Sequence, residues 1–267
     1  MAAVIPVASA DDPRLAGYTR LTDAEHRRAR EDADGTFVVE GVTAIRRALA
    51  SRYVVRSVLV TPAKHAALES DLATSTADVY VVERDVMNAV AGFDLHRGAV
   101  AVAARRPFTD LATVATTARR VAVLEGLNDH ENLGAVARSA AALGIAALVL
   151  DPTCADPFYR RCVRVSMGEI LHLDLARADP WPDRLDLLRA RGFALVALAP
   201  DPSADPIDVV AARVAEQPVA VLLGAEGPGL SAPALAFVDH RARIPMRPGA
   251  DSLNVGHAAA IAFYVLR

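Results

Sequence analysis

Short apolar runs alternate with amphipathic stretches along the whole chain. In the second half, mostly apolar runs predict buried strands at residues 121–127, 146–151, 171–176, 194–200, 219–224 and 241–246. Segments with helical periodicity separate these runs, and an apolar helix beginning at Asn254 follows the last one. Strands that are apolar on both faces and alternate with helices are typical of a parallel sheet covered on both sides. The second half is therefore predicted to be an α/β domain.

The first half shows a weaker form of the same alternation. Its patterns predict strands at 36–41, 56–61, 78–83 and the end of 93–105, with helices between them. A chain of 267 residues suits two domains, and the register changes after residues 106–119, a stretch with Pro107 near one end. We therefore expect a disordered tail over 1–17, a small α/β domain over 18–105, a linker over 106–119 and a larger domain over 120–267.

Composition narrows the class of protein. Hydrophobic residues make up 53% of the chain, enough for two cores, and the net charge of −3 argues mildly against a nucleic-acid binder. Lys64 is the only lysine, so any phosphate contact in the chain would be made mainly by arginine. Cys154 and Cys162 form no CxxC pair, so we expect no metal site and a reducing compartment. No apolar run approaches the length of a membrane span, and we expect a cytoplasmic protein.

Polar, glycine-containing loops follow three of the predicted strands in the second half. Ligands of parallel sheets bind beyond the carboxyl ends of the strands, so chemistry is expected in these loops. They read LNDHENLGAVARSAAALG (127–144), VLLGAEGPGLS (221–231) and IPMRPGADSLNVGHAAA (244–260).

Each loop has a structural and a functional interpretation. Asn132 would serve as a helix N-cap, and Arg138 would be a surface arginine or a functional group in an otherwise apolar helix. Glu226 sits among glycines that permit close backbone approach, in a loop that is neither a Walker A motif nor GxGxxG. Ser252 and Asn254 would cap the last helix or face a ligand.

The segments NLGAVARSAAALG, LLGAEGPGLS and IPMRPGADSLNVGHAAAIAFY resemble, in order and spacing, the three motifs of the SpoU/TrmH-type RNA ribose 2′-O-methyltransferases of the SPOUT superfamily. The first motif departs from the family pattern, because Asp129 stands where proline is common. In the first half, GTFVVEGVTAIRRAL and FDLHRGAVAV resemble the L30e-like substrate-binding domain that many members of this family carry.

The resemblance implies a trefoil-knotted parallel-sheet domain over 120–267 that works as a homodimer and needs no metal. It also implies that S-adenosylmethionine is held by a set of apolar, glycine and serine positions, namely Leu223, Gly224, Gly229, Ile244, Met246, Ser252 and Leu253. The catalytic positions that it implies are Asn132, Arg138, Glu226, Ser252 and Asn254.

The reaction would move a methyl group from a sulfonium to a ribose 2′-hydroxyl, so the enzyme must align three atoms and manage one proton. Arg138 is a poor general base, because the pKa of arginine exceeds about 12. We therefore expect its guanidinium to bind the substrate phosphate and to stabilise the developing alkoxide. The alternative, that Arg138 takes the proton, stays open. Arginines expected to contact RNA are Arg28, Arg47, Arg160 and Arg164, although a salt-bridged helix face is the competing interpretation.

Ribosomal RNA is the favoured substrate, because the two-domain layout resembles rRNA enzymes more than tRNA enzymes. A tRNA substrate and a role in antibiotic resistance stay open. A second hypothesis is a catalytically silent RNA-binding or assembly factor. The presence of all the expected site residues argues against it. A nucleotide-dependent oxidoreductase is a third, which the missing GxGxxG disfavours.

Overall fold

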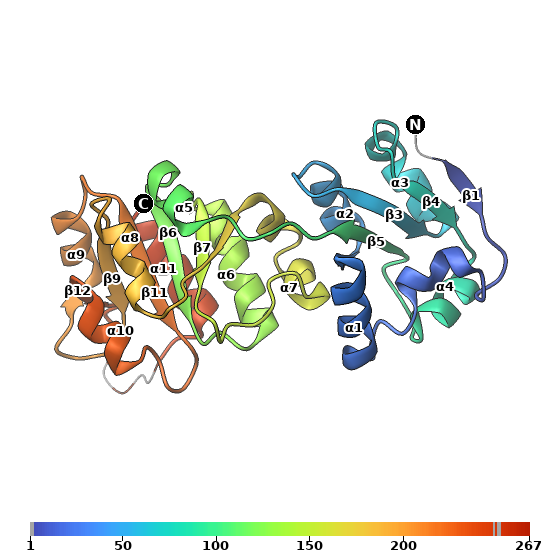
Figure 1. The fold of residues 1–267 in the computed structure, drawn as a ribbon. Helices are drawn as coiled ribbons and strands as arrows, with labels where there is room; N and C mark the ends of the chain where they lie inside the picture. Colours follow the sequence, from blue (N-terminus) through green and yellow to red (C-terminus); the bar gives the residue numbers. More distant parts are fainter. Residues whose placement is uncertain (1–2, 248, 250–251) are drawn as a thin grey trace. The chain divides into compact units, whose positions relative to one another are not determined.

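The structure is a computed structural model that describes residues 3–247, 249 and 252–267, and it divides into two compact units (Figure 1). The N-terminal unit comprises Met1–Arg106 and Phe158–His172, and the C-terminal unit comprises Pro107–Pro157 and Leu173–Arg267. Both are α/β, as the alternation of strands and helices predicts.

The N-terminal unit is built on a mixed five-stranded sheet of order β1-β4-β3-β5-β2. The β1/β4 and β4/β3 pairs are parallel, whereas β5 runs antiparallel to β3 and β2. The strands are β1 (Val4–Pro6), β2 (Thr36–Glu40), β3 (Val55–Val60), β4 (Asp78–Val81) and β5 (Ala99–Ala104). The helices are η1 (Pro13–Tyr18), α1 (Ala24–Asp34), α2 (Val42–Leu49), α3 (Pro62–Leu72), α4 (Arg84–Ala91), α7 (Arg160–Val165) and η2 (Glu169–His172).

Residues 3–17 differ from the disordered tail that was expected over 1–17. Strand β1 pairs with the edge strand β4, with Val4 opposite Val79 and Pro6 opposite Val81. Leu15 is fully buried in the core of the unit. A short apolar VIP segment can complete a sheet edge, so an apolar stretch without charge at the start of the chain is better interpreted as an edge strand.

Residues 158–172 differ from the expected contiguous C-terminal domain, because they pack on the N-terminal unit. Phe158 lies against the rings of Phe37 and Tyr53, with centroid separations of 5.1 and 5.5 Å. Gly168 has a φ of +84°, and a Cβ there would lie 3.1 Å from the backbone of Ala44 in α2. This close backbone contact explains why glycine is needed at position 168.

The C-terminal unit has a seven-stranded parallel sheet of order β10-β12-β9-β11-β6-β7-β8. Its strands are β6 (Arg120–Glu125), β7 (Ala147–Leu150), β8 (Asp174–Arg177), β9 (Ala194–Leu198), β10 (Asp205–Pro206), β11 (Val219–Gly224) and β12 (His240–Arg243). Its helices are α5 (Leu111–Thr117), α6 (His130–Ala142), η3 (Asp183–Leu185), α8 (Asp186–Arg189), α9 (Ile207–Arg213), α10 (Ala232–Phe237) and α11 (Val255–Val265).

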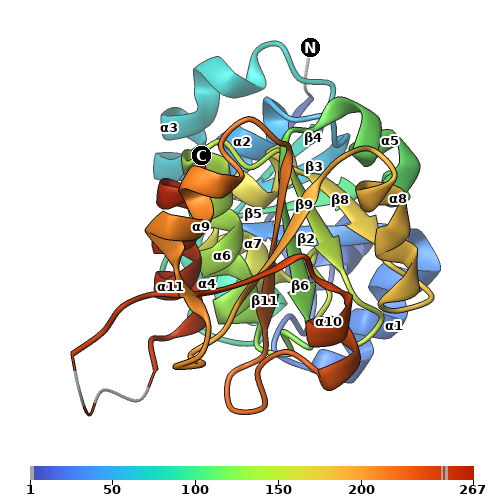
Figure 2. The same ribbon diagram turned by 90° about the vertical axis from the view of Figure 1, so that its left-hand side faces the viewer.

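Helices cover both faces of the seven-stranded sheet, which explains why β7, β9 and β11 are almost entirely apolar, whereas the strands near the edges, β8, β10 and β12, carry charged residues. Figure 2 shows α6, α9 and α11 on one face and α5, α8 and α10 on the other. Helix α5 lies within the expected linker 106–119, where Leu111 and Val114 are buried in the core of the C-terminal unit. Among the described residues, no helix is both long and apolar enough to cross a membrane.

Small residues bring α6 and α11 close together. A Cβ added to Gly256 would lie 3.0 Å from the Cβ of Ala135, so the two helices cross with almost no side chain between them. The alanine-rich sequence of the last helix is therefore explained by this close crossing. It places the first turns of α6 and α11 beside each other.

Candidate active site

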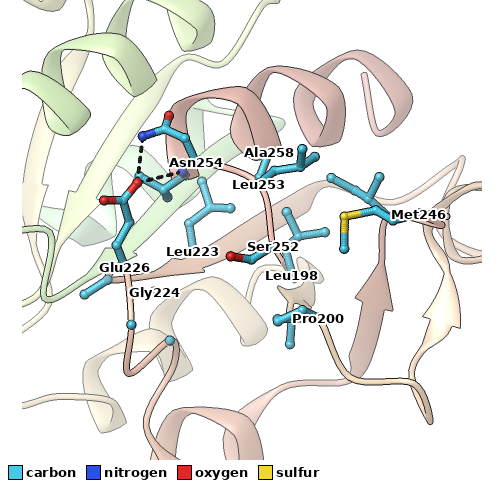
Figure 3. Close-up of a pocket in the computed structure, with 16 residues that line it drawn as sticks. Leu198, Pro200, Leu223, Gly224, Glu226, Met246, Ser252, Leu253, Asn254 and Ala258 are labelled. Atoms are coloured by element: carbon cyan, nitrogen blue, oxygen red, sulfur yellow. Dashed lines mark hydrogen bonds between the residues drawn. The ribbon is translucent and has the colours of Figure 1, made fainter. Parts of the chain in front are cut away.

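A cavity of about 710 Å³ opens where the chain leaves three adjacent strands of the C-terminal sheet, β12, β9 and β11 (Figure 3). The segment that enters α11 forms its remaining wall. Its lining residues are Leu198, Ala199, Pro200, Leu223, Gly224, Ala225, Glu226, Gly227, Gly229, Ile244, Met246, Ser252, Leu253, Asn254, Val255 and Ala258. A site at the carboxyl ends of parallel strands is where the sequence predicts ligand binding.

The glycine-rich loop after β11 folds back on its own strand. The N–H of Gly229 donates to the carbonyl of Ala225 at 2.9 Å, which closes the loop. A Cβ on Gly224 would lie only 2.2 Å from the carbonyl carbon of Gly229, so any side chain there would push the loop away. The loop thus presents mainly backbone to the cavity, as close approach to a ligand requires.

One wall of the cavity is apolar. Side chains of Leu198, Pro200, Leu223, Met246 and Leu253 surround it in Figure 3. Leu253 is 39% exposed, so its side chain is accessible to a ligand in the cavity. This wall suits a flat aromatic group such as a purine base.

A hydrogen-bonded cluster contributed by all three predicted loops lies at the polar edge of the cavity, where Glu226 and Asn254 line the wall and Asn132 joins them from outside it. The side-chain amide of Asn254 donates to Glu226 Oε1 at 2.6 Å and to Asn132 Oδ1 at 2.9 Å. The N–H of Val255 also faces Glu226 Oε1, at 3.4 Å. Three residues that are far apart in the sequence therefore form one connected polar group at the edge of the cavity.

The structure resolves which residues cap the two helices at the site. Asn254 caps α11, because its Oδ1 accepts from the N–H of Gly256 at 2.9 Å, whereas Ser252 lines the cavity. The prediction of Asn132 as a cap of α6 is wrong. Asp129 takes that position, accepting from the N–H groups of Glu131 and Asn132, so that Asn132 keeps its side chain for the cluster.

Arg138 lies on the exposed side of α6, six residues beyond Asn132. It does not line the cavity, and within the described part of the chain its guanidinium has no hydrogen bond or ion pair. An exposed arginine without an internal partner is available for a phosphate or an oxyanion.

Three of the four arginines expected to contact RNA have partners inside the N-terminal unit. Arg160 is buried and pairs with Glu40 at 2.7 Å, so it cannot reach RNA without breaking a buried ion pair, and we withdraw it from the set. Arg47 donates to the carbonyl of Met167 and pairs with Glu169, both at 2.7 Å.

Arg164 lies 3.7 Å from Glu40 and remains partly exposed. Arg28 is exposed on α1, with no ion pair among the described residues. Of the expected set, Arg28 is therefore the arginine with the greatest freedom to bind phosphate.

Leu198, Ala199 and Pro200 line the cavity but were not predicted from the sequence. The available signal was strand β9 itself, because a strand beside β11 must end at the same edge of the sheet. The apolar sequence ALVALAP (194–200) does not indicate a ligand. The order of strands in the sheet is what places the end of this segment at the cavity.

Two further features bear on the chemistry of the site. Burial raises the pKa of Cys154 to about 12, aided by the neighbouring Asp151 carboxylate, so the thiol stays protonated near neutral pH and is no nucleophile.

Within the described residues, no group of three or more histidine, cysteine or acidic side chains is placed to hold a metal ion.

Comparison with known protein families and sequences gives matches over both units. Residues 119–264 match the SpoU rRNA Methylase family, and residues 20–101 match the MRM3-like substrate binding domain. The chain is 46% identical to the uncharacterized tRNA/rRNA methyltransferase Rv0881 of Mycobacterium tuberculosis, over 97% of this chain and 90% of the relative. It is 30% identical to the 23S rRNA (guanosine(2553)-2′-O)-methyltransferase RlmP of Bacillus subtilis, over 98% of both chains.

Solved structures show the same architecture over the whole chain. The AdoMet-bound rRNA methyltransferase of Sinorhizobium meliloti superimposes with a TM-score of 0.82 at 25% identity, covering 99% of this chain and 97% of that one. The SpoU methyltransferase AviRb of Streptomyces viridochromogenes in complex with AdoMet gives 0.78 at 26% identity, covering 96% and 97%. The chain belongs to the SpoU rRNA methylase family and is an S-adenosylmethionine-dependent RNA 2′-O-methyltransferase.

Proposed function

We propose that the chain methylates a ribose 2′-hydroxyl of ribosomal RNA, with S-adenosylmethionine bound in the cavity beside β9, β11 and β12. The observation that carries this proposal is the joining of one apolar, backbone-lined cavity to the Asn132–Asn254–Glu226 cluster. S-adenosylmethionine, when bound, supplies an activated methyl group on a sulfonium. The residues of this chain must then position the ribose and stabilise its oxygen.

The cavity fits the parts of this cofactor. The apolar side chains of Ile244, Met246 and Leu253 would enclose the adenine, and the exposed backbone of Leu223 and Gly224 would lie along the adenine and ribose. Ser252 and Gly229 complete the predicted cofactor set, and both line the same cavity. The backbone N–H and C=O groups that the glycines expose are suitable partners for adenine and hydroxyl groups.

Asn132, Glu226 and Asn254 would hold the substrate side of the site in place. Glu226 accepts from both Asn254 and the backbone of Val255, so its carboxylate is already engaged and orients the start of α11. Arg138, without an internal partner among the described residues, would clamp the RNA phosphate and the developing alkoxide.

Ribosomal RNA is favoured over tRNA because RlmP, a 23S rRNA enzyme, aligns over 98% of both chains, including the N-terminal unit. The alternative of a catalytically silent RNA-binding factor is disfavoured because Arg138 and Ser252 are present and Asn132, Glu226 and Asn254 form one cluster. We place the activity in the cytoplasm, where ribosomal RNA is available.

A homodimer formed through the C-terminal unit is part of the proposal. The outer side of α11 exposes large apolar side chains, with Ile261 38% and Tyr264 56% exposed. Apolar groups at this spacing on one helix form a stripe that a second subunit could cover. Sedimentation equilibrium would measure the mass in solution directly, and a monomer at micromolar concentration would contradict this part.

The decisive experiment maps ribose 2′-O-methyl groups in RNA from cells with and without the gene. One 23S or 16S rRNA position should lose its methyl group in the deletion and regain it with the wild-type chain, but not with Arg138→Ala. A lost methyl group confined to tRNA would reject the rRNA assignment. An unchanged methyl pattern in every RNA, together with no heat of S-adenosylmethionine binding, would support the silent factor.

A further inference from the structure

Glu125, the last residue of β6, accepts hydrogen bonds from two separate segments of the C-terminal unit. Its Oε1 accepts from the indole N–H of Trp181 at 2.6 Å, and its Oε2 accepts from the backbone N–H of Ser231 at 2.8 Å. Both donors are neutral, and Glu125 itself does not line the cavity. A carboxylate with one donor on each oxygen has a defined orientation.

The Ser231 contact fixes the far end of the glycine-rich loop. Ser231 caps α10, with its Oγ accepting from the N–H of Ala234, and Leu230 before it is buried in the core. The near end of the loop leaves β11 at Gly224, which pairs with Glu125 in the sheet. Glu125 therefore ties the end of the loop to the strand beside which the loop begins.

The Trp181 contact connects the same carboxylate to the hydrophobic core. The indole ring of Trp181 packs against the core cluster that includes Leu230. Its N–H would lose this partner without Glu125, and a partly buried indole N–H usually has one. The ring thus holds the carboxylate through a contact that is separate from the loop.

We propose that Glu125 is a positioning residue for the cofactor, acting through the loop that carries Glu226, Gly227 and Gly229 into the cavity. This inference rests on the proposed cofactor site. The loop has no helix or strand of its own beyond the isolated Ala225–Gly229 bridge, so its path depends on how its two ends are held. Cofactor affinity, rather than the chemical step, is the quantity that Glu125 controls.

The test is Glu125→Gln, assayed by methyl transfer with S-adenosylmethionine and RNA varied in turn. Glutamine has one acceptor oxygen, so its NH2 group must face either the Trp181 or the Ser231 N–H, donor against donor. We expect KM for S-adenosylmethionine to rise about tenfold. Turnover at saturating cofactor and KM for RNA should stay within about twofold. Glu216→Gln, an exposed carboxylate of the same unit, is the matched control and should change neither constant.

A second variant separates positioning from a general loss of structure. Trp181→Phe keeps a ring in the core and removes the N–H, so the NH2 group introduced by Glu125→Gln no longer faces a donor there. Trp181→Phe combined with Glu125→Gln should therefore recover part of the cofactor affinity that Glu125→Gln loses. Trp181→Phe alone should raise KM for S-adenosylmethionine about threefold. Additive losses in the double variant, or an unchanged cofactor KM in both single variants, would overturn the inference.

The two proposals fail in different ways. If the wild-type chain gave no heat with S-adenosylmethionine by calorimetry, the cofactor site would be rejected and the role of Glu125 with it. If the wild type bound the cofactor and Glu125→Gln bound it equally well, only the role of Glu125 would be rejected.

Discussion

Asn254 and Glu226 are joined by a 2.6 Å hydrogen bond across 28 positions of sequence, and the same Asn254 side chain caps the last helix. The amide group divides its two functions between its two atoms. Its oxygen accepts from the N–H of Gly256, and its nitrogen donates to Glu226 and Asn132. Helix capping and the assembly of the site are therefore one arrangement.

Substitutions can separate the two roles of the Asn254 side chain, helix capping and assembly of the site. Asn254→Ala removes both functions, and we expect a loss of about 1 kcal/mol in the free energy of unfolding, with methyl transfer reduced at least tenfold. Asn254→Asp keeps an acceptor for Gly256 but sets a second carboxylate against Glu226, so stability should largely return while activity does not. Thermal unfolding and single-turnover methyl transfer check the two outcomes. Full activity in Asn254→Asp would contradict the role of the cluster.

Arg138 should matter for turnover and little for the cofactor. Arg138→Ala removes the exposed guanidinium, so methyl transfer should become undetectable while calorimetric affinity for S-adenosylmethionine stays within about twofold. Arg138→Lys should also be poor, because an ammonium lacks the planar fork that binds two oxygens at once. Arg191→Ala, at an exposed position of the same unit, is the control. Wild-type turnover in Arg138→Ala would reject the assignment.

Gly224 should tolerate no side chain. A Cβ there would lie 2.2 Å from the carbonyl carbon of Gly229, so Gly224→Ala must displace the cofactor loop. We expect cofactor binding to fall at least a hundredfold, measured by calorimetry. In Gly227→Ala the new methyl group meets no atom within 4 Å, although the φ of +89° imposes strain of about 1 kcal/mol. That variant should bind the cofactor measurably, and equal losses in both would contradict the steric explanation.

Substitution of Arg160 should lower stability, whereas substitution of Arg28 should weaken RNA binding. Arg160→Ala leaves Glu40 buried, with Arg164 at 3.7 Å as its remaining ion-pair partner among the described residues, and should cost about 3–5 kcal/mol of unfolding free energy. Arg28→Ala should leave the melting temperature unchanged and weaken RNA binding. The slope of log affinity against log salt should then fall by about 1. An unaltered melting temperature in Arg160→Ala would contradict the importance of its ion pair.

Local patterns in the sequence determined most of the architecture. Strand β11 appears at residues 219–224, as the apolar run predicts, because a strand buried on both faces has to be apolar at every position. Glycines around Glu226 marked a loop with exposed backbone, and two of the three polar loops at strand ends, those after β11 and β12, line the cavity. These features depend on a few neighbouring residues, so the sequence expresses them directly.

Only the tertiary structure decided which distant residues meet. Asn132 and Asn254 are 122 positions apart, and nothing in either segment specifies that their amides are 2.9 Å from each other. Likewise, Arg160 looked like a free basic residue until the packing of 158–172 on the N-terminal unit paired it with Glu40. The physical reason is that periodicity reports which face of an element is buried, whereas partners across the fold depend on the path of the chain.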